Sequence, residues 1–278
     1  MAKKKTTNIT KVQANAALAR PDFMADAPLG IDDLRQYVTP PRIKVVQKQA
    51  RTDLLDMFGV GDVIVVPANI VVTEMGRTDK GQPTGEADPF FIVPLFFYVE
   101  WCTWNPLELK GKVPAIRDRS FDPKSALALK AKSSEHRKEL IPGEKDLYMR
   151  HVEHLNFIVM LYDHPTLGGA PVVMTFARGE HFSGRGLCNL IKLRKAPLYG
   201  CVFECHLGHR ENEQGDWWGL DIINPAGDVS PWVNAEEFEA FKALHLEFVK
   251  AHQDARIRVD YDEAEADPAA VPQAKEEF

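Results

Sequence analysis

Apolar and polar positions alternate along several short stretches of the chain, a pattern that is typical of β-strands. Ile43 and Val45 alternate with Arg42, Lys44 and Val46, which predicts a half-buried strand with a basic outer face. Apolar runs bounded by Gly, Pro, Asn and Asp predict further strands over residues 63–66, 70–73, 155–162, 172–176, 199–207 and 217–223.

The most aromatic stretch covers residues 90–104. Phenylalanine, tyrosine and tryptophan recur through it, Pro94 divides it, and Asn105-Pro106 closes it. Aromatic residues favour strands, whereas a proline inside a strand requires an edge or an irregularity. The stretch therefore predicts a long, bent strand that is buried on at least one face.

Helical spacing appears in three places. Asp122-Pro123 is a start signal for a helix over residues 125–140, and a second helix is predicted over residues 183–194. A third, over residues 235–253, has an apolar stripe formed by Phe238, Phe241, Leu244, Phe248 and Val249.

The order of these elements predicts a mainly β fold with helical additions. Strands and helices do not alternate regularly, which favours a β-barrel or sandwich over a doubly wound sheet. We expect a flexible N-terminal arm over residues 1–34, one domain over residues 35–234 with an insertion at about 108–150, a helix over residues 235–255 and a disordered acidic tail over residues 256–278.

The net charge belongs to the last nineteen residues. The whole chain has 34 basic and 40 acidic residues, and residues 260–278 account for 1 and 7 of them, which leaves 33 of each in the body. The tail has little to bury, so it should not fold alone. It could serve only solubility, or it could bind a basic surface through its acids and a pocket through Phe278.

Cysteine usage and hydropathy bear on the compartment. Four cysteines in 278 residues do not suggest a disulfide framework, and no apolar run has the length of a membrane span or of a signal core. We therefore expect a cytoplasmic protein with no membrane partner.

Basic and aromatic residues occur together in several stretches, which points to single-stranded nucleic acid. Cations follow the phosphates of a single strand, and each base stacked on an aromatic ring contributes about 1–3 kcal/mol. We expect bases to stack on Trp101, Trp104 and Tyr199, whereas most other aromatic residues should lie in the core. The expected phosphate contacts are Arg42, Lys44, Lys48, Arg51, Arg117, Arg119, Arg178, Arg185, Lys192, Arg194 and Lys195. Because the body is neutral overall, this hypothesis requires the cations to cluster in one groove.

Two other groups of residues could indicate a metal site or an anion-binding loop. Cys201, Cys205, His206 and His209 are soft metal ligands at short spacing, but in a strand His206 faces away from both cysteines. This stretch therefore favours core or surface roles over a zinc site, and we expect no cofactor.

A glycine-rich stretch, Gly179-x4-Gly184-Arg185-Gly186, lies between a predicted strand and a predicted helix, a setting that suits an anion. Nucleotide-hydrolysing loops have Lys and then Ser or Thr where this chain has Arg185 and Gly186. The spacings support no catalytic triad or carboxylate pair, so we expect the protein not to be an enzyme.

Three features together resemble the bacteriophage single-stranded DNA-binding proteins of the T7 replication type. They are Pro41-Arg42-Ile43-Lys44, the aromatic strand over residues 90–104, and the tail ending on Phe278. The resemblance implies an OB fold, a Greek-key barrel that binds single strands, and a tail that contacts replication proteins while competing with DNA. The tail residues to which it assigns this role are Asp260, Asp262, Glu263, Glu265, Asp267, Glu276, Glu277 and Phe278. The tail is less densely acidic than that of the family's typical member, and the insertion at about 108–150 has no family role.

The sequence thus predicts a single-stranded DNA-binding protein of phage DNA replication or recombination, with little sequence specificity. Its expected partners are single-stranded DNA and, through the tail, replication or recombination proteins; self-association stays open. Two alternatives remain at this point. One is a protein-interaction or virion-associated factor that binds no nucleic acid, and the other is a metal-dependent nucleic-acid enzyme.

Overall fold

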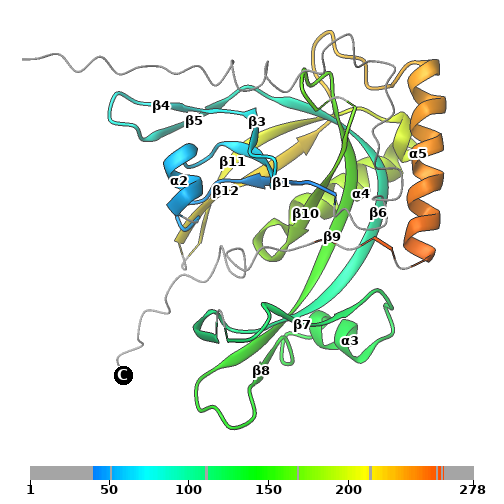
Figure 1. Cartoon of the computed structure of the whole chain (residues 1–278). Helices are drawn as coiled ribbons and strands as arrows, with labels where there is room; N and C mark the ends of the chain where they lie inside the picture. Colours follow the sequence, from blue (N-terminus) through cyan, green and yellow to red (C-terminus); the bar gives the residue numbers. More distant parts are fainter. Residues whose placement is uncertain are drawn as a thin grey trace, which may run out of the picture.

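The strands form one curled sheet and one separate hairpin. A computed structural model of the chain describes residues 40–50, 52–109, 112–167, 169–212, 215–254, 256, 257 and 259. The ten-stranded sheet follows the order β12-β11-β6-β9-β10-β1-β2-β3, with β7 added to β6 and β8 added to β9, and β4 pairs with β5 in the hairpin. The strands are β1 (Arg42–Val45), β2 (Val63–Val66), β3 (Ile70–Thr73), β4 (Met75–Arg77), β5 (Pro83–Ala87), β6 (Phe90–Trp104), β7 (Ile116–Ser120), β8 (Lys138–Leu140), β9 (Tyr148–Tyr162), β10 (Pro171–Ala177), β11 (Phe203–Asn212) and β12 (Gly215–Ile223). Figure 1 shows the sheet curled into a half-barrel, so the predicted mainly β, OB-like architecture with helical additions is confirmed.

The curl brings the edge strand β12 close to the segment that follows β1. The side-chain amide of Gln47 donates to the carbonyl oxygen of Trp218 at 2.6 Å, and its oxygen accepts from the Trp218 backbone N–H at 3.0 Å. Two neighbouring residues of an antiparallel sheet exchange the same pair of hydrogen bonds. The Gln47 side chain therefore satisfies the backbone N–H and C=O of Trp218, as a neighbouring strand would.

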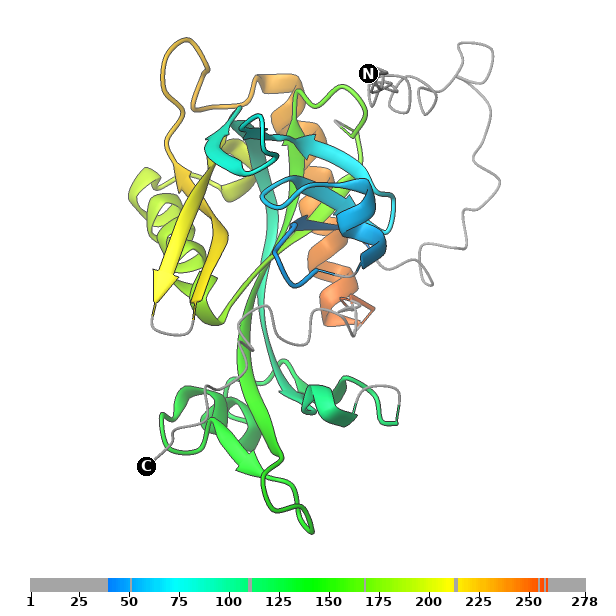
Figure 2. The same cartoon turned by 90° about the vertical axis from the view of Figure 1, so that its left-hand side faces the viewer.

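Helices cover both faces of the sheet. The inner face packs against α4 (His181–Arg194), whose Leu187 is fully buried among residues of β9, β10 and β12. The outer face packs against α5 (Ala235–Gln253) and the residues after it. A short helix, α2 (Thr52–Met57), covers β2. Both faces of the central strands are therefore buried, and Figure 2 shows α4 and α5 on different sides of the sheet.

Strands β6 and β9 are 15 residues long and extend beyond the half-barrel. Their lower ends, β7, β8, the helix α3 (Ala126–Lys132) and the 3-10 turn Leu107–Leu109 form a second body, here called the insertion lobe, which stands apart from the half-barrel in Figure 2. The narrow junction between the two bodies is called the waist. A register shift between Pro94 and Phe96 accommodates the proline that divides β6.

Three elements differ from the sequence predictions. The strand predicted over residues 199–207 begins at Phe203, because Leu198–Gly200 forms a 3-10 turn. The helix predicted over residues 125–140 ends at Lys132, where Ser133 caps it in an extended conformation, and Lys138–Leu140 instead pairs with β9 as β8. β9 begins at Tyr148 rather than at residue 155. Its first half is rich in charged and histidine residues that face partners from the lobe, so hydropathy alone did not indicate a strand.

The C-terminal helix has the predicted bounds, and Asn234 and Glu237 form a capping box at its start. The chain does not leave the body at residue 256, because Ile257 and Val259 are buried in the outer-face core. In the described part of the chain, no helix is long and apolar enough to cross a membrane.

Candidate nucleic-acid interface

The predicted nucleic-acid residues do not line one groove. They fall into three groups: a buried set at the waist, a set held in structural contacts, and an exposed set on α4. Arg51 lies outside the described residues, and so do Asp260, Asp262, Glu263, Glu265, Asp267, Glu276, Glu277 and Phe278.

Strand β1 does not have a basic, solvent-facing side. It lies between β10 and β2, and Arg42 and Val46 are buried on the side opposite Ile43. Lys44 is partly exposed. The predicted basic outer face was wrong for Arg42, because the alternation of one strand cannot show which of its residues other elements cover.

The set at the waist, here called the waist cluster, consists of four buried residues, Arg42, Glu100, Trp104 and His154, and two half-buried ones, Arg119 and Arg178. These residues come from four strands and a turn that are far apart in the sequence. Trp104 Nε1 donates to His154 Nε2 at 3.1 Å, and the guanidinium of Arg178 lies 5.9 Å from the centre of the Trp104 ring. Arg119 Nη1 donates to Glu100 Oε1 at 3.1 Å, and Glu100 is fully buried. The fold therefore brings three of the predicted arginines together.

His154 is held neutral at the centre of the waist cluster. Burial lowers its pKa well below the usual value, and the nearby cations Arg178, Arg119 and Arg42 lower it further. A neutral ring leaves Nε2 free to accept the Trp104 N–H bond. The histidine is therefore a hydrogen-bonding part of the interior and not a cation.

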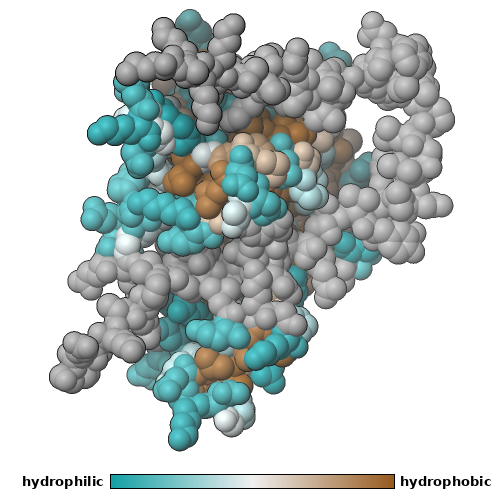
Figure 3. All heavy atoms as spheres, turned by 60° about the vertical axis from the view of Figure 1, so that its left-hand side comes forward, coloured by the Kyte–Doolittle hydropathy of each residue, from teal (hydrophilic) through white to brown (hydrophobic). Residues whose placement is uncertain are grey.

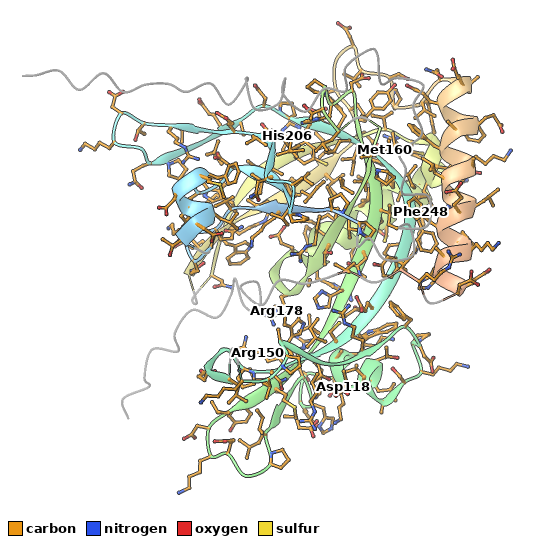
Figure 4. All side chains as sticks on the ribbon, viewed as in Figure 1. Asp118, Arg150, Met160, Arg178, His206 and Phe248 are labelled. Atoms are coloured by element: carbon orange, nitrogen blue, oxygen red, sulfur yellow. The ribbon has the colours of Figure 1, made fainter. Side chains whose placement is uncertain are left out.

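Arg178 has a left-handed backbone, with φ of 52°. This conformation is uncommon for residues other than glycine, and here it turns the chain from β10 into the 3-10 turn Arg178–Glu180. Figure 4 shows Arg178 at the waist, above Arg150 of the insertion lobe. The turn places its guanidinium over Trp104.

The two tryptophans predicted to stack on bases are both buried, with 4% of each exposed. Trp101 Nε1 donates to Glu153 Oε1 at 3.2 Å, and Lys132 Nζ lies 4.9 Å from the centre of its ring. Neither ring presents a face to solvent, so the stacking prediction for these two residues is wrong. They are core residues of a strand whose two faces are both covered.

Several other predicted residues hold the fold together. Lys48 pairs with Asp216 at 2.6 Å. Arg194 donates to Asn224 Oδ1 and to the carbonyl oxygen of Pro231. Tyr199 packs against Phe238 and His245 of α5, with ring centres 5.2 and 5.0 Å away.

Arg117 lies on β7 of the insertion lobe. It is about half exposed, it lies 3.8 Å from Asp118, and its Nη1 donates to the sulfur of Met149 at 3.2 Å.

The glycine-rich stretch serves packing. A Cβ on Gly179 would meet the Trp217 ring at 2.8 Å, and one on Gly184 would meet Phe176 at 2.7 Å. Glu180, at the helix start, accepts from Trp217 Nε1 at 2.8 Å and from the Leu220 N–H at 3.1 Å. The helix N-terminus therefore already has a carboxylate beside it, which disfavours a second anion there.

The outward side of α4 is the exposed set. Phe182 is 81% exposed, and Arg185, Asn189 and Lys192 follow it at the spacing of one helix face. These four residues are called the α4 stripe. Lys195 follows the helix as its exposed cap, and Leu193, beside the stripe, is 76% exposed. The sequence reasoning missed Phe182 because the predicted helix began one residue after it.

The C-terminal segment ends its described part at the waist. Arg119 Nη1 donates to the carbonyl oxygen of Val259 at 2.7 Å, and Val259 is buried. The acidic residues that begin with Asp260 follow directly in the sequence. The tail therefore starts beside the arginines of the waist cluster.

The cysteines and histidines weighed as metal ligands are separated. Burial raises the pKa of the Cys205 thiol, and His206 and His209 pair instead with Glu204 and Asp216. Within the described ranges, no three His, Cys, Asp or Glu side chains are grouped as a metal site requires.

The chain matches the model of a known protein family. A model of the Pam3 phage gp34-like protein family matches residues 81–253, which is more than half of the chain. The chain belongs to this phage family. The match spans the insertion lobe, α4 and α5, so the α4 stripe and every residue of the waist cluster except Arg42 lie within the part shared with the Pam3 gp34-like family. Searches of curated proteins and of solved structures found no match.

Proposed function

We propose that this phage protein binds single-stranded DNA through the α4 stripe, as a non-enzymatic factor of phage replication or recombination in the host cytoplasm. One observation carries the proposal: an aromatic side chain, Phe182, is 81% exposed in line with Arg185 and Lys192. Leaving a large apolar ring in water is unfavourable, whereas an unpaired base can cover it.

The spacing of the stripe suits a strand of nucleic acid. Phe182 and Lys192 are ten residues apart on one helix face, which corresponds to roughly 15 Å along the axis. A ring at the end of a row of cations can take a base while the cations take phosphates. Paired bases in a duplex do not offer their faces, so the stripe favours a single strand over a double helix.

The tail has a place in this proposal. It starts at the waist, where Arg119 holds Val259, and it carries 7 acidic residues and 1 basic residue. We propose that these acids compete with DNA for basic surface of the body, and that Phe278 and its acidic neighbours recruit replication or recombination proteins.

The test is a binding titration with fluorescently labelled oligo-dT at low salt, followed by anisotropy. Phe182→Ala should weaken binding by about 1–3 kcal/mol, as expected for one lost stack. Arg185→Ala and Lys192→Ala should each reduce the salt slope of log K by about 0.7, as expected for one lost phosphate contact.

Matched controls lie on α5. Leu246→Ala removes an exposed apolar side chain, 59% exposed, and Lys250→Ala removes an exposed cation. Both should leave binding unchanged. If the full-length protein bound no oligo-dT at low salt, the proposal would be wrong, and the exposed Phe182 and Leu193 would instead favour a protein partner.

A further inference from the structure

The insertion lobe carries a second surface that combines cations with an exposed aromatic ring. Strand β8 pairs with the first residues of β9, with Lys138 opposite Arg150 and Leu140 opposite Tyr148. Residues that are directly opposite in an antiparallel pair point to the same side. These four side chains therefore share one side of the two-stranded ribbon, which is called the ribbon face.

The acidic side chain of β8 lies on the other side. Glu139 forms an ion pair with Lys130 of α3 and lies 3.1 Å from His151 Nε2. These contacts hold the inner side of the ribbon against the lobe. All four positions of the ribbon face are thus basic or apolar, and the acid between them is directed away.

The ribbon face is accessible. Leu140 and Tyr148 are 44% and 46% exposed, Lys138 is exposed and Arg150 is partly exposed. Figure 3 shows apolar atoms at the surface of this lobe within a hydrophilic surround.

The ribbon face continues into the waist. Arg150 is paired across the sheet with Trp104, over which the guanidinium of Arg178 lies. Figure 4 shows Arg150 and Arg178 following one another at the junction of the two bodies. The ribbon face therefore lies close to the turn that precedes Phe182.

We propose that the ribbon face is a second contact for the same single strand, with phosphates at Lys138 and Arg150 and a base on Tyr148. The inference rests on the proposed single-strand binding and assigns a function to the insertion. The charge of the face selects a nucleic-acid strand as its occupant, because a protein partner would have to supply acids that match a basic pair.

The experiment compares variants of the ribbon face with variants elsewhere on the insertion lobe, all in the full-length protein. The affinity for labelled oligo-dT is measured over a range of salt concentrations. Lys138→Ala should reduce the salt slope of log K by about 0.7. Tyr148→Ala should weaken binding about tenfold at low salt. The matched controls lie elsewhere on the lobe: Arg117→Ala removes a half-exposed cation of β7, and Leu129→Ala removes an apolar side chain of α3 that is 61% exposed. Oligonucleotides carrying 4-thiothymidine should cross-link to Tyr148 under ultraviolet light.

The outcomes separate this inference from the proposal on which it rests. If the ribbon variants bind as the unmodified protein does while Phe182→Ala weakens binding, the ribbon contact is refuted and the α4 stripe stands. If the ribbon variants weaken binding and Phe182→Ala does not, the ribbon is supported and the stripe is refuted. If Arg117→Ala reduces the salt slope of log K as much as Lys138→Ala does, the lobe attracts DNA through its overall charge, and the ribbon face is not a specific binding site. If no oligo-dT binds to the full-length protein, both are wrong.

Discussion

The waist cluster and the α4 stripe use the same residue types in opposite ways. Each combines an aromatic ring with arginine or lysine, and both contain residues that the sequence marked as nucleic-acid contacts. At the waist, Trp104 is 4% exposed and the fully buried Glu100 pairs with Arg119. On α4, Phe182 is 81% exposed and the cations beside it face solvent.

The difference shows that the exposure of these residues, and not their type, determines whether they stabilise the fold or remain available to a ligand. A buried cation requires a partner because its desolvation is costly, so the waist residues are committed to one another. An exposed cation costs little to leave in water and remains available for a ligand. Substitutions in the two regions should therefore change different measured quantities.

The largest effect should come from Glu100 at the waist. Glu100→Gln removes the charge of a fully buried carboxylate from its ion pair with Arg119, which should lower the free energy of unfolding by about 3–5 kcal/mol. Urea unfolding followed by circular dichroism measures this loss. Arg185→Ala on the α4 stripe should change the free energy of unfolding by no more than about 0.5 kcal/mol. Equal losses for the two variants would contradict the comparison.

The second largest effects are expected for substitutions of Trp104 at the waist and of Phe182 on the α4 stripe. Trp104→Phe removes the indole N–H that donates to the buried His154. This should lower the free energy of unfolding by about 1–3 kcal/mol and leave the affinity for oligo-dT unchanged. Phe182→Ala should show the reverse, with weaker binding and unchanged stability. Loss of affinity in Trp104→Phe, measured where the variant is fully folded, would show that the waist contacts DNA.

The sequence predicted most elements of the fold but less of the site. The run over residues 90–104 and the stripe of α5 have strong periodicity, so β6 and α5 were found. β8 and the first half of β9 were missed because His151 and Glu139 satisfy each other across strands, which no local pattern shows. The burial of Arg42 and Trp104 depends on neighbours far along the chain, such as His154 and Arg178, so charge clustering in sequence indicated the wrong surface. Phe182 could have been found, because it lies three residues before Arg185 on the polar side of a predicted helix.

A shorter chain sharpens the comparison further. Ending the chain at Val259 keeps the buried Ile257 and Val259 in place and removes the acidic tail. We expect unchanged unfolding by urea and tighter oligo-dT binding at low salt, because competing acids are lost. Deleting Phe278 alone should leave DNA affinity nearly unchanged while it disrupts partner recruitment. Weaker binding after truncation would show that the tail does not compete with DNA.

The smallest effect should appear as a pH dependence of stability that originates at the waist. His154 has a pKa near 6.5 in the unfolded chain and a much lower one in the folded protein, because burial and the cations Arg178, Arg119 and Arg42 oppose its protonation. The unfolded state therefore binds more protons below pH 6.5, so stability is complete above that pH and falls on acidification, by at most about 1.4 kcal/mol per pH unit for this group. His154→Gln keeps an acceptor for Trp104 but does not titrate, so it should flatten the fall in urea midpoint between about pH 6.5 and 5.5. Some dependence should persist, because burial also lowers the pKa of His164 and of His252. An unchanged pH profile in His154→Gln would mean that folding does not lower the pKa of His154.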